Sequence, residues 1–402
     1  MKRRNTLTAV LFLAFLAVGF WLLASAFIQG GALREQFGLV RRDLSQLPAF
    51  LDGGAETAAN EDLDRDHGFI QLFGGFQRLL GRRVVEDVSG SNHVALLDDG
   101  ALNFVALGAQ PADCSGNGEK AAAFQQTLTA RGIPSLYVVA PQKLRRNTDL
   151  LPIGMHNYGN EAADSLLAAL DAADTDYLDL RPFFEATEDY ASWFFRTDHH
   201  WKPEAGFFTW QILAQELEER LGYATPAELT APESWDTQVL EDFFLGSQGK
   251  RVGTLYAGTD DFTLYTPRFD TDLTYSCPSY PFERTGPFST SVCFPERVAQ
   301  RDLFGGNPYT YYSGGDYPLA AVTNHKNPDG PSILLLRESF SCAVAPFLAL
   351  SCSQLTTVDL RYFQGDLMET VEQLQPDLVL ILYNASSSGV ESLFRFGGSV
   401  EE

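Results

Sequence analysis

Short apolar, β-prone runs alternate with amphipathic helical segments along most of this chain, and few folds accommodate that order. The strand-like runs lie at 69–73, 94–97, 135–140, 177–180, 332–336, 356–358 and 378–383. The helical segments lie at 118–131, 161–173 and 203–221, and two more run up to 350 and up to 375. A helix between two strands lets them run parallel and covers one face of their sheet. The sequence therefore predicts an α/β domain with a mainly parallel sheet.

The amino terminus predicts the compartment of this domain. Lys2, Arg3 and Arg4 precede an almost uncharged run from Leu7 to Ile28, and about 20 apolar residues suffice for a membrane-spanning helix. The run is longer than the roughly 7–15-residue core of a cleaved signal peptide, although the small residues at 24–26 keep cleavage open as an alternative. Because positive residues stay inside, we expect a single-pass anchor with a cytoplasmic N-terminus and an extracytoplasmic domain.

Changes in residue composition along the chain suggest four parts. Residues 1–30 are expected to form the membrane anchor, and residues 31–65 a stalk or outer helix. The α/β domain comprises 66–223 and 331–402. Between these two segments, residues 224–330 are rich in Gly, Pro, Thr and Tyr, which indicates an irregular β-rich insertion. Its aromatic residues suit either a sugar-stacking wall over a site or an ordinary core.

Charge and cysteine content exclude several partners. The 402 residues carry a formal net charge of −23, and nucleic-acid binding depends on Lys and Arg that neutralise phosphates, so we expect no nucleic-acid partner. Five cysteines are too few for a disulfide-stapled scaffold, and no spacing resembles a zinc site. A disulfide between Cys277 and Cys293, which flank a turn-rich segment, stays open; Cys342 and Cys352 are expected to be buried thiols. We expect neither a metal nor a cofactor.

The segment Arg196-Thr197-Asp198-His199-His200-Trp201 holds two of the six histidines of the chain. A neighbouring carboxylate can hold an imidazole in one tautomer and stabilise its cation, as a general base requires. Pro203 then suits the first turn of a helix, so the pair lies in a loop of the kind that carries chemistry in open α/β sheets. A polar loop satisfied by its own backbone is the alternative interpretation. Metal binding by Asp198, His199 and His200 is disfavoured, because adjacent histidines are expected to point apart.

A candidate nucleophile follows more than a hundred residues later. The apolar run 332–336 leads through Arg337 and Glu338 into Ser339 and then into an apolar helical segment. A serine at the end of a strand projects from the sheet, and the free N–H groups of the following helix can stabilise an oxyanion. The alternative interpretation of Ser339 is an ordinary helix N-cap.

The motif Thr197-Asp198-His199-His200-Trp201, followed by Lys202-Pro203-Glu204-Ala205-Gly206, resembles the motif of the DHHW family of exported bacterial proteins. It is also similar to the Thr-Asp-x-His-Trp motif of periplasmic alginate O-acetyltransferase proteins. Weaker likenesses lie at 132–143, 359–362 and 376–380. The resemblance implies an SGNH-hydrolase-like domain, a flavodoxin-like three-layer fold, in an exported bacterial protein. With the anchor expected from the N-terminal run, we expect the protein in the bacterial cell membrane.

Carried over residue by residue, the resemblance implies Ser339 as nucleophile, His200 as general base and Asp198 as the group that orients it. His200 is preferred to His199 because the alginate proteins keep only the second position, which leaves His199 a structural role. Glu338 stands where those families have Asp. The Phe340 amide, Arg361 and Asn384 are candidates for binding the oxyanion or substrate, with ion pairing and turn capping as their alternatives.

The function implied is transfer of an acyl group, most simply acetyl, through a covalent acyl-serine to a cell-surface polysaccharide. The resemblance also implies a membrane-bound O-acyltransferase partner that supplies the acyl group. A carbohydrate acetylesterase would use the same three residues with water as acceptor. A non-catalytic assembly protein that binds glycan through 224–330 is the third alternative.

Overall fold

The computed structural model describes residues 2–64, 67–86, 93–107, 110–280 and 282–397. The chain divides into two compact units: residues 1–82 with 251–256, and residues 83–250 with 257–402. Each unit is described by itself below.

The first unit is built from α1 (Lys2–Gln29), α2 (Ala32–Arg42), α3 (Leu47–Ala49), α4 (Ala55–Asp64) and α5 (Gly68–Leu79). Within α1, the 18-residue stretch Phe12–Gln29 is long and apolar enough to cross a membrane. The buried carboxylate of Asp62 in α4 accepts hydrogen bonds from Ala32 N at 2.7 Å and Leu33 N at 3.0 Å. It therefore satisfies two of the amides that the first turn of α2 leaves without partners.

The expected strand at 69–73 is wrong, because these residues belong to α5. Phe69, Leu72, Phe73 and Phe76 recur at spacings of three and four residues, which is the helical period. A five-residue apolar window alone does not distinguish the two structures.

In the described part of the chain, eight strands form the main sheet in the order β10-β9-β11-β13-β12-β14-β4-β6. Five of them are parallel, as the alternation predicted: β13 (Gln354–Val358), β12 (Ser332–Arg337), β14 (Leu378–Asn384), β4 (Ser135–Ala140) and β6 (Tyr177–Asp179). The antiparallel strands β11 (Leu319–Asn324), β9 (Leu273–Cys277) and β10 (Phe282–Gly286) extend the sheet beyond β13. Residues 224–330 thus contribute three strands to the main sheet.

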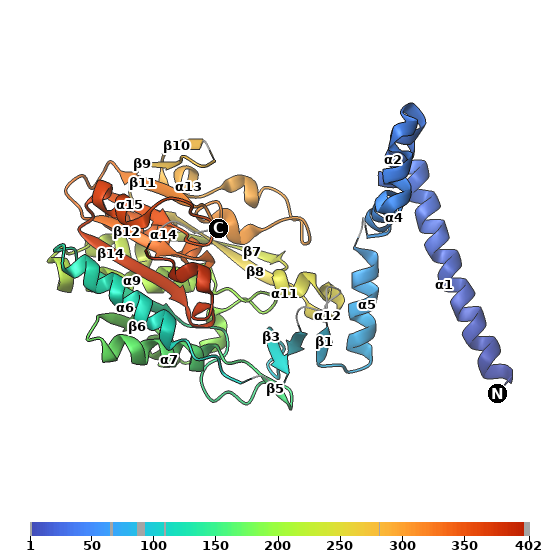
Figure 1. Ribbon diagram of the computed structural model, residues 1–402, viewed down its shortest axis with the longest axis horizontal. Helices are drawn as coiled ribbons and strands as arrows, with labels where there is room; N and C mark the ends of the chain where they lie inside the picture. Colours follow the sequence, from blue (N-terminus) through green and yellow to red (C-terminus); the bar gives the residue numbers. More distant parts are fainter. Residues whose placement is uncertain (1, 65–66, 87–92, 108–109, 281, 398–402) are drawn as a thin grey trace. The chain divides into compact units, whose positions relative to one another are not determined.

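Helices cover both faces of this sheet (Figure 1), and buried apolar side chains lie between the helices and the strands. On one face, α6 (Ser115–Thr129), α7 (Gly159–Ala172) and α15 (Leu367–Leu374) pack on alternate residues of β4, β12 and β14. On the other face, α9 (Pro203–Leu221) and α14 (Ala345–Leu348) join an aromatic cluster from 235–312. Strands buried on both faces are continuous apolar runs, which is why they were recognisable in the sequence.

Smaller elements surround this three-layer core. The strands β1 (Val84–Glu86), β2 (His93–Leu96), β3 (Leu102–Leu107) and β5 (Met155–His156) form one sheet, and β7 (Trp235–Phe244) pairs with β8 (Asp260–Pro267) in a two-stranded sheet. The short helices of this unit are α8 (Arg181–Glu185), α10 (Ala227–Thr230), α11 (Ser247–Lys250) and α13 (Phe288–Ser291), whereas α12 (Thr254–Ala257) begins in the 251–256 segment of the first unit. All five cysteines lie in the described ranges and are buried free thiols, so Cys277 and Cys293 form no disulfide.

Candidate active site

The Asp-His motif lies in a tight loop whose two arms pair with each other. Phe194 and Trp201 form an isolated antiparallel bridge, and Phe195 N donates to His200 O at 3.2 Å. Lys202 is the N-cap residue of α9, and Pro203 occupies its first turn, where its missing N–H costs nothing. The loop is therefore fixed at one end by its own pairing and at the other by the start of a long helix.

Three predicted residues meet in one hydrogen-bonded chain. His200 Nε2 lies 2.7 Å from Ser339 Oγ, and His200 Nδ1 lies 2.5 Å from Asp198 Oδ1. The Asp198 and His200 side chains are 4% and 12% exposed, whereas Ser339 is only half-buried. The residue Ser339 is thus partly exposed, and the Asp198 carboxylate at the other end of the chain of contacts is buried.

Asp198 is held as an anion by the groups around it. Burial opposes ionisation, but the two neighbouring histidines and the hydrogen bonds from His200 and from Ser247 N hold the pKa of Asp198 well below its usual range. Asp198 Oδ1 also accepts from His200 N at 2.9 Å. A Cβ on Gly246 would lie 2.2 Å from the Asp198 Cβ, so only glycine lets the 246–247 backbone approach this carboxylate.

Two residues of the 224–330 region fix the backbone just before Asp198. Arg196 N and Thr197 N donate to the Asp260 carboxylate at 2.7 and 2.8 Å, and the Thr197 hydroxyl donates to it as well. Gly249 N in turn donates to Thr197 O at 2.8 Å. No pattern in the sequence indicates Asp260 or Gly249, because they act only through contacts formed on folding.

Ser339 stands where β12 ends and the 3₁₀ helix η7 (Ser339–Ala343) begins. The N-cap of η7 is Glu338, not Ser339, and the Glu338 side chain accepts from Phe340 N at 3.3 Å. Glu338 Oε2 also lies 3.0 Å from Ser339 Oγ, and Oε1 accepts from Asn384 N at 3.2 Å. The interpretation of Ser339 as a simple cap is therefore wrong, because the Glu338 side chain is the cap of this turn.

The three candidate oxyanion or substrate groups are already engaged. The Phe340 amide donates to Glu338, and Arg361 pairs with Asp359 and Asp316. The Asn384 side chain donates to Pro141 O at 2.7 Å and caps the turn at Ser386. By contrast, the Ser339 amide N–H at the start of η7 makes no hydrogen bond to any described residue. This amide was missed because the sequence does not show which helix-start N–H is free.

Aromatic side chains from distant segments orient the imidazole. The Tyr309 ring stacks on His200 with centroids 4.2 Å apart and an interplanar angle of 22°. The Tyr309 hydroxyl and Trp201 Nε1 both donate to Phe340 O, at 3.2 and 2.9 Å. Trp201 of the motif thus ties the histidine loop to the serine turn. Tyr309 was missed, because nothing in the sequence places residue 309 beside residue 200.

His199 lies beside His200, so the expectation that the adjacent rings point apart is wrong. Their centroids are 3.9 Å apart, and the ligating atoms of Asp198, His199 and His200 all lie within 4.8 Å of one another. Both nitrogen atoms of His200 are already bonded, so a cation here would displace the bond to Asp198 or to Ser339. His199 Nδ1 lies 3.0 Å from Ser247 Oγ, and partial burial with the adjacent His200 lowers its pKa.

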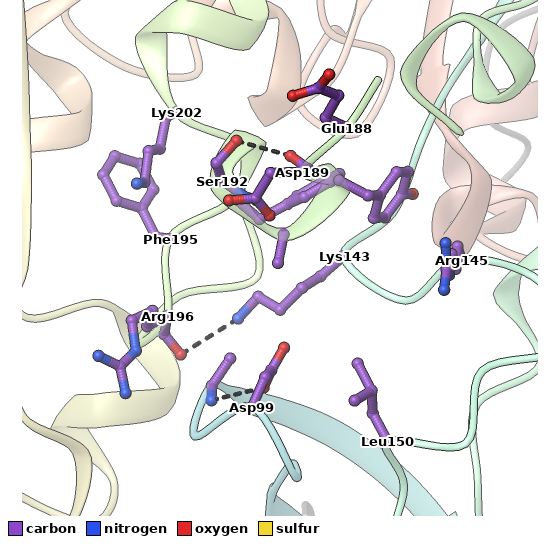
Figure 2. A pocket seen from close by; sticks show the side chains of 14 residues that line it. Asp99, Lys143, Arg145, Leu150, Glu188, Asp189, Ser192, Phe195, Arg196 and Lys202 are labelled. Carbon is purple, nitrogen blue, oxygen red and sulfur yellow. Dashed lines mark hydrogen bonds between the residues drawn. The ribbon is translucent and has the colours of Figure 1, made fainter. Parts of the chain in front are cut away.

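A cavity of about 460 Å³ flanks the loop before Asp198 (Figure 2). Its charged lining residues are Asp99, Lys143, Arg145, Glu188, Asp189, Arg196 and Lys202. Lys143 is buried, and its ammonium group donates to the carbonyl oxygens of Leu102 and Arg196 and to Gln248 Oε1. Burial lowers the pKa of Lys143 to about 8. Within the described residues, the cavity is lined by Phe194, Phe195 and Arg196 of the loop and not by Asp198, His200 or Ser339.

Comparison with known proteins identifies this architecture. Residues 104–243 match the family model described as the SGNH hydrolase-like domain of the acetyltransferase AlgX. The structure of Bacillus cereus PatB1 has a TM-score of 0.63 at 21% identity, over 76% of this chain and 100% of that protein. A DHHW family protein from Eubacterium siraeum has a TM-score of 0.58 at 18% identity, over 79% and 99%. No curated protein sequence matches the chain.

These likenesses confirm the resemblance and the fold class that the motif implied. The chain has an SGNH hydrolase-like α/β fold with a mixed sheet. The family match also supports the prediction of an SGNH-like acyltransferase or esterase.

Proposed function

On this SGNH hydrolase-like fold, we propose that the chain is an extracytoplasmic O-acyltransferase that transfers acetyl groups to a cell-surface polysaccharide. The observation that carries the proposal is the continuous contact from Asp198 through His200 to Ser339, with distances of 2.5 and 2.7 Å. A nucleophile bonded to a base, which is bonded to an orienting carboxylate, is the arrangement that acyl transfer through a covalent intermediate requires.

In the first half-reaction, Ser339 Oγ attacks the carbonyl carbon of the acyl donor while its hydroxyl proton passes to His200 Nε2. The π electrons of the carbonyl move to its oxygen, and the anionic Asp198 stabilises the imidazolium that forms. When the tetrahedral intermediate collapses, the leaving group takes the proton from His200. The product is an acetyl ester of Ser339.

In the second half-reaction, a sugar hydroxyl takes the place of the leaving group. His200 Nε2 accepts the hydroxyl proton as the sugar oxygen attacks the ester carbon, and Ser339 departs with that proton. General acid–base assistance of this kind contributes roughly 10²–10⁴-fold to the rate.

The free Ser339 amide is our first candidate for stabilising the oxyanion, because an N–H without a partner beside the nucleophile can donate to developing negative charge. The Phe340 amide would join it only if Glu338 moved away. For Arg361, we propose support of the turn through its ion pairs with Asp359 and Asp316. For Asn384, we propose a structural role, because its backbone N–H donates to Glu338 and its side chain donates to Pro141 O at the end of β4.

The acyl donor is proposed to reach the site from a membrane-bound O-acyltransferase partner. The stretch Phe12–Gln29 supports a single-pass anchor, with the N-terminus inside and the catalytic unit outside. Such an anchor would keep the enzyme near a donor delivered through the membrane. The match to the acetyltransferase AlgX model supports acetyl as the acyl group. Polysaccharide is proposed as the acceptor from the resemblance of the Thr197–Trp201 motif to that of the alginate O-acetyltransferase proteins.

The test compares wild type, Ser339→Ala and His200→Ala as full chains in detergent. Para-nitrophenyl acetate is the donor, and intact-mass analysis follows the acetyl-enzyme. We expect one acetyl group on Ser339 in wild type only. Acetylation of Ser339→Ala to the same extent would overturn the proposal.

A second measurement separates transfer from hydrolysis. Purified bacterial surface polysaccharide or short β-linked oligosaccharides are added to the acetyl-enzyme. Faster loss of the acetyl group, with acetylated sugar as product, supports the transferase. Release of acetate at a rate that added sugar does not change supports the esterase, and glycan binding without any acetyl-enzyme supports the assembly protein.

A further inference from the structure

Ser339 Oγ has two close polar neighbours, and a hydroxyl has only one proton to donate. His200 Nε2 lies 2.7 Å from it and Glu338 Oε2 lies 3.0 Å from it. If the hydroxyl proton points to His200, the Glu338 contact is a hydrogen bond only when Glu338 donates. If the proton points to Glu338, His200 Nε2 must itself carry a proton. In either case His200 and Glu338 together carry one proton in addition to the His200 Nδ1 proton that faces Asp198.

The surroundings of Glu338 favour the proton on its carboxyl group. The side chain is buried, with 3% exposure. Burial raises the pKa of Glu338, and the nearby Asp316 acts in the same direction, whereas Arg361, His200 and the hydrogen bond from Phe340 N act in the opposite direction. The Arg361 guanidinium is bonded to the carboxylates of Asp359 and Asp316. Among the described residues, the phenols of Tyr137, Tyr309 and Tyr383 also interact electrostatically with Glu338.

The two amides that donate to Glu338 are compatible with a neutral carboxyl group. Its carbonyl oxygen, Oε1, can accept from Asn384 N, and its hydroxyl oxygen, Oε2, keeps a lone pair for Phe340 N. Both contacts exceed 3.1 Å, which is long for hydrogen bonds from N–H groups to an ionised carboxylate.

We propose that Glu338 is a positioning residue that acts as a neutral carboxylic acid. Its Oε2–H donates to Ser339 Oγ and directs the single hydroxyl proton of Ser339 toward His200 Nε2. This inference rests on the proposed function, because it assigns Glu338 a role in preparing Ser339 for attack.

The protonation state of Glu338 then controls the reactivity of Ser339. When Glu338 loses its proton, the carboxylate competes with His200 for the serine hydroxyl. Acylation should therefore fall at alkaline pH. In Glu338→Gln the amide group donates at every pH, so this fall should disappear.

The experiment measures acetylation of Ser339 by para-nitrophenyl acetate from pH 6 to pH 10 in the full chain in detergent. Wild type, Glu338→Gln and Glu338→Ala are compared, with Glu391→Gln as a matched control because Glu391 is an exposed glutamate paired with Lys120. We expect Glu338→Gln to react within about tenfold of wild type at pH 7 and to lack the alkaline fall. Glu338→Ala should be slower at all pH values, and Glu391→Gln should match wild type.

Two results would overturn the proposal: a loss of more than a hundredfold in a Glu338→Gln protein that melts at the wild-type temperature, or an unchanged alkaline fall in that variant. Infrared spectroscopy gives a readout that needs no activity. A protonated-carboxyl band in wild type at neutral pH, missing in Glu338→Gln, is expected, and its absence from wild type would refute a neutral Glu338. If the band is present while Ser339 is never acetylated, the proposed function fails and the protonation of Glu338 stands.

Discussion

Replacement of Gly206 by alanine should weaken both the fold and the active site, because α9 touches the serine turn at this glycine. A Cβ on Gly206 would lie 2.1 Å from Ala343 O, 2.6 Å from Ala343 C and 2.9 Å from Ala343 Cβ. Ala343 ends η7, the 3₁₀ helix that starts at Ser339. Two of the three atoms are main-chain atoms and the third is fixed to the main chain, so no side-chain rotation relieves the overlap.

The size of the effect follows from these distances. Carbon atoms pack at about 3.5 Å or more, so α9 and η7 would have to separate by about 1 Å. Overpacking of this kind costs about 1–3 kcal/mol, partly offset by the gain of about 1 kcal/mol for alanine over glycine in a helix. We expect a fall of roughly 2–4 °C in the melting temperature. Since His200 precedes α9 by three residues, the same shift should lengthen the His200–Ser339 contact, and a misplacement of about 1 Å costs roughly 10²-fold in rate.

The assay pairs thermal unfolding with acetylation of Ser339 by para-nitrophenyl acetate. Gly116→Ala is the matched control, because Gly116 is also in the first turn of a helix, α6, and its Cβ would meet no atom within 4 Å. That control should be as stable as wild type or slightly more stable, with unchanged acetylation. Wild-type melting and acetylation in Gly206→Ala would refute the idea that this close approach aligns the two halves of the site.

Three further predictions follow from single contacts. Asp198→Asn should lower the rate of Ser339 acetylation by roughly 10⁴-fold, because it removes the anion that fixes the imidazole tautomer; a loss below tenfold in stopped-flow measurements would contradict that role. Burial lowers the pKa of Lys143 to about 8, so between about pH 8 and pH 10.5 the unfolded chain binds more protons than the folded one, and Lys143 should add about 1.4 kcal/mol per pH unit to the free energy of unfolding. Urea titrations should show this rise in wild type relative to Lys143→Met, and equal slopes would argue against a charged, buried Lys143. A reducing agent should leave the melting temperature unchanged, because Cys277 and Cys293 are free thiols; a drop equivalent to about 2–5 kcal/mol would indicate a disulfide.

Much of the parallel sheet was predictable from the sequence because its strands are buried on both faces. The run 378–383 is apolar at every position and became β14, since a strand between two layers has no polar face. The run 69–73 was misassigned because five apolar residues fit either period, and only the next turn of α5 decides between them. The strands β9–β11 could not be assigned to the main sheet, because the periodicity of a strand does not show which other strand it pairs with.

The sequence by itself determined the chemical groups: an Asp-His pair at the start of a helix, and a serine at the end of a buried strand. These are local patterns, because strand ends and helix starts depend on neighbouring residues. Only the tertiary structure decided that His200 and Ser339 lie 2.7 Å apart, that Glu338 shares the serine hydroxyl, and that Tyr309 stacks on the imidazole. The contacts of His200 with Ser339 and Tyr309 join residues from different segments. The contact between Glu338 and Ser339 depends on the side-chain conformation that Glu338 adopts in the folded protein. The physical reason is that hydrogen bonds and ring stacking act over a few ångströms. The spacing of two residues in the sequence does not determine whether they lie that close in the folded chain.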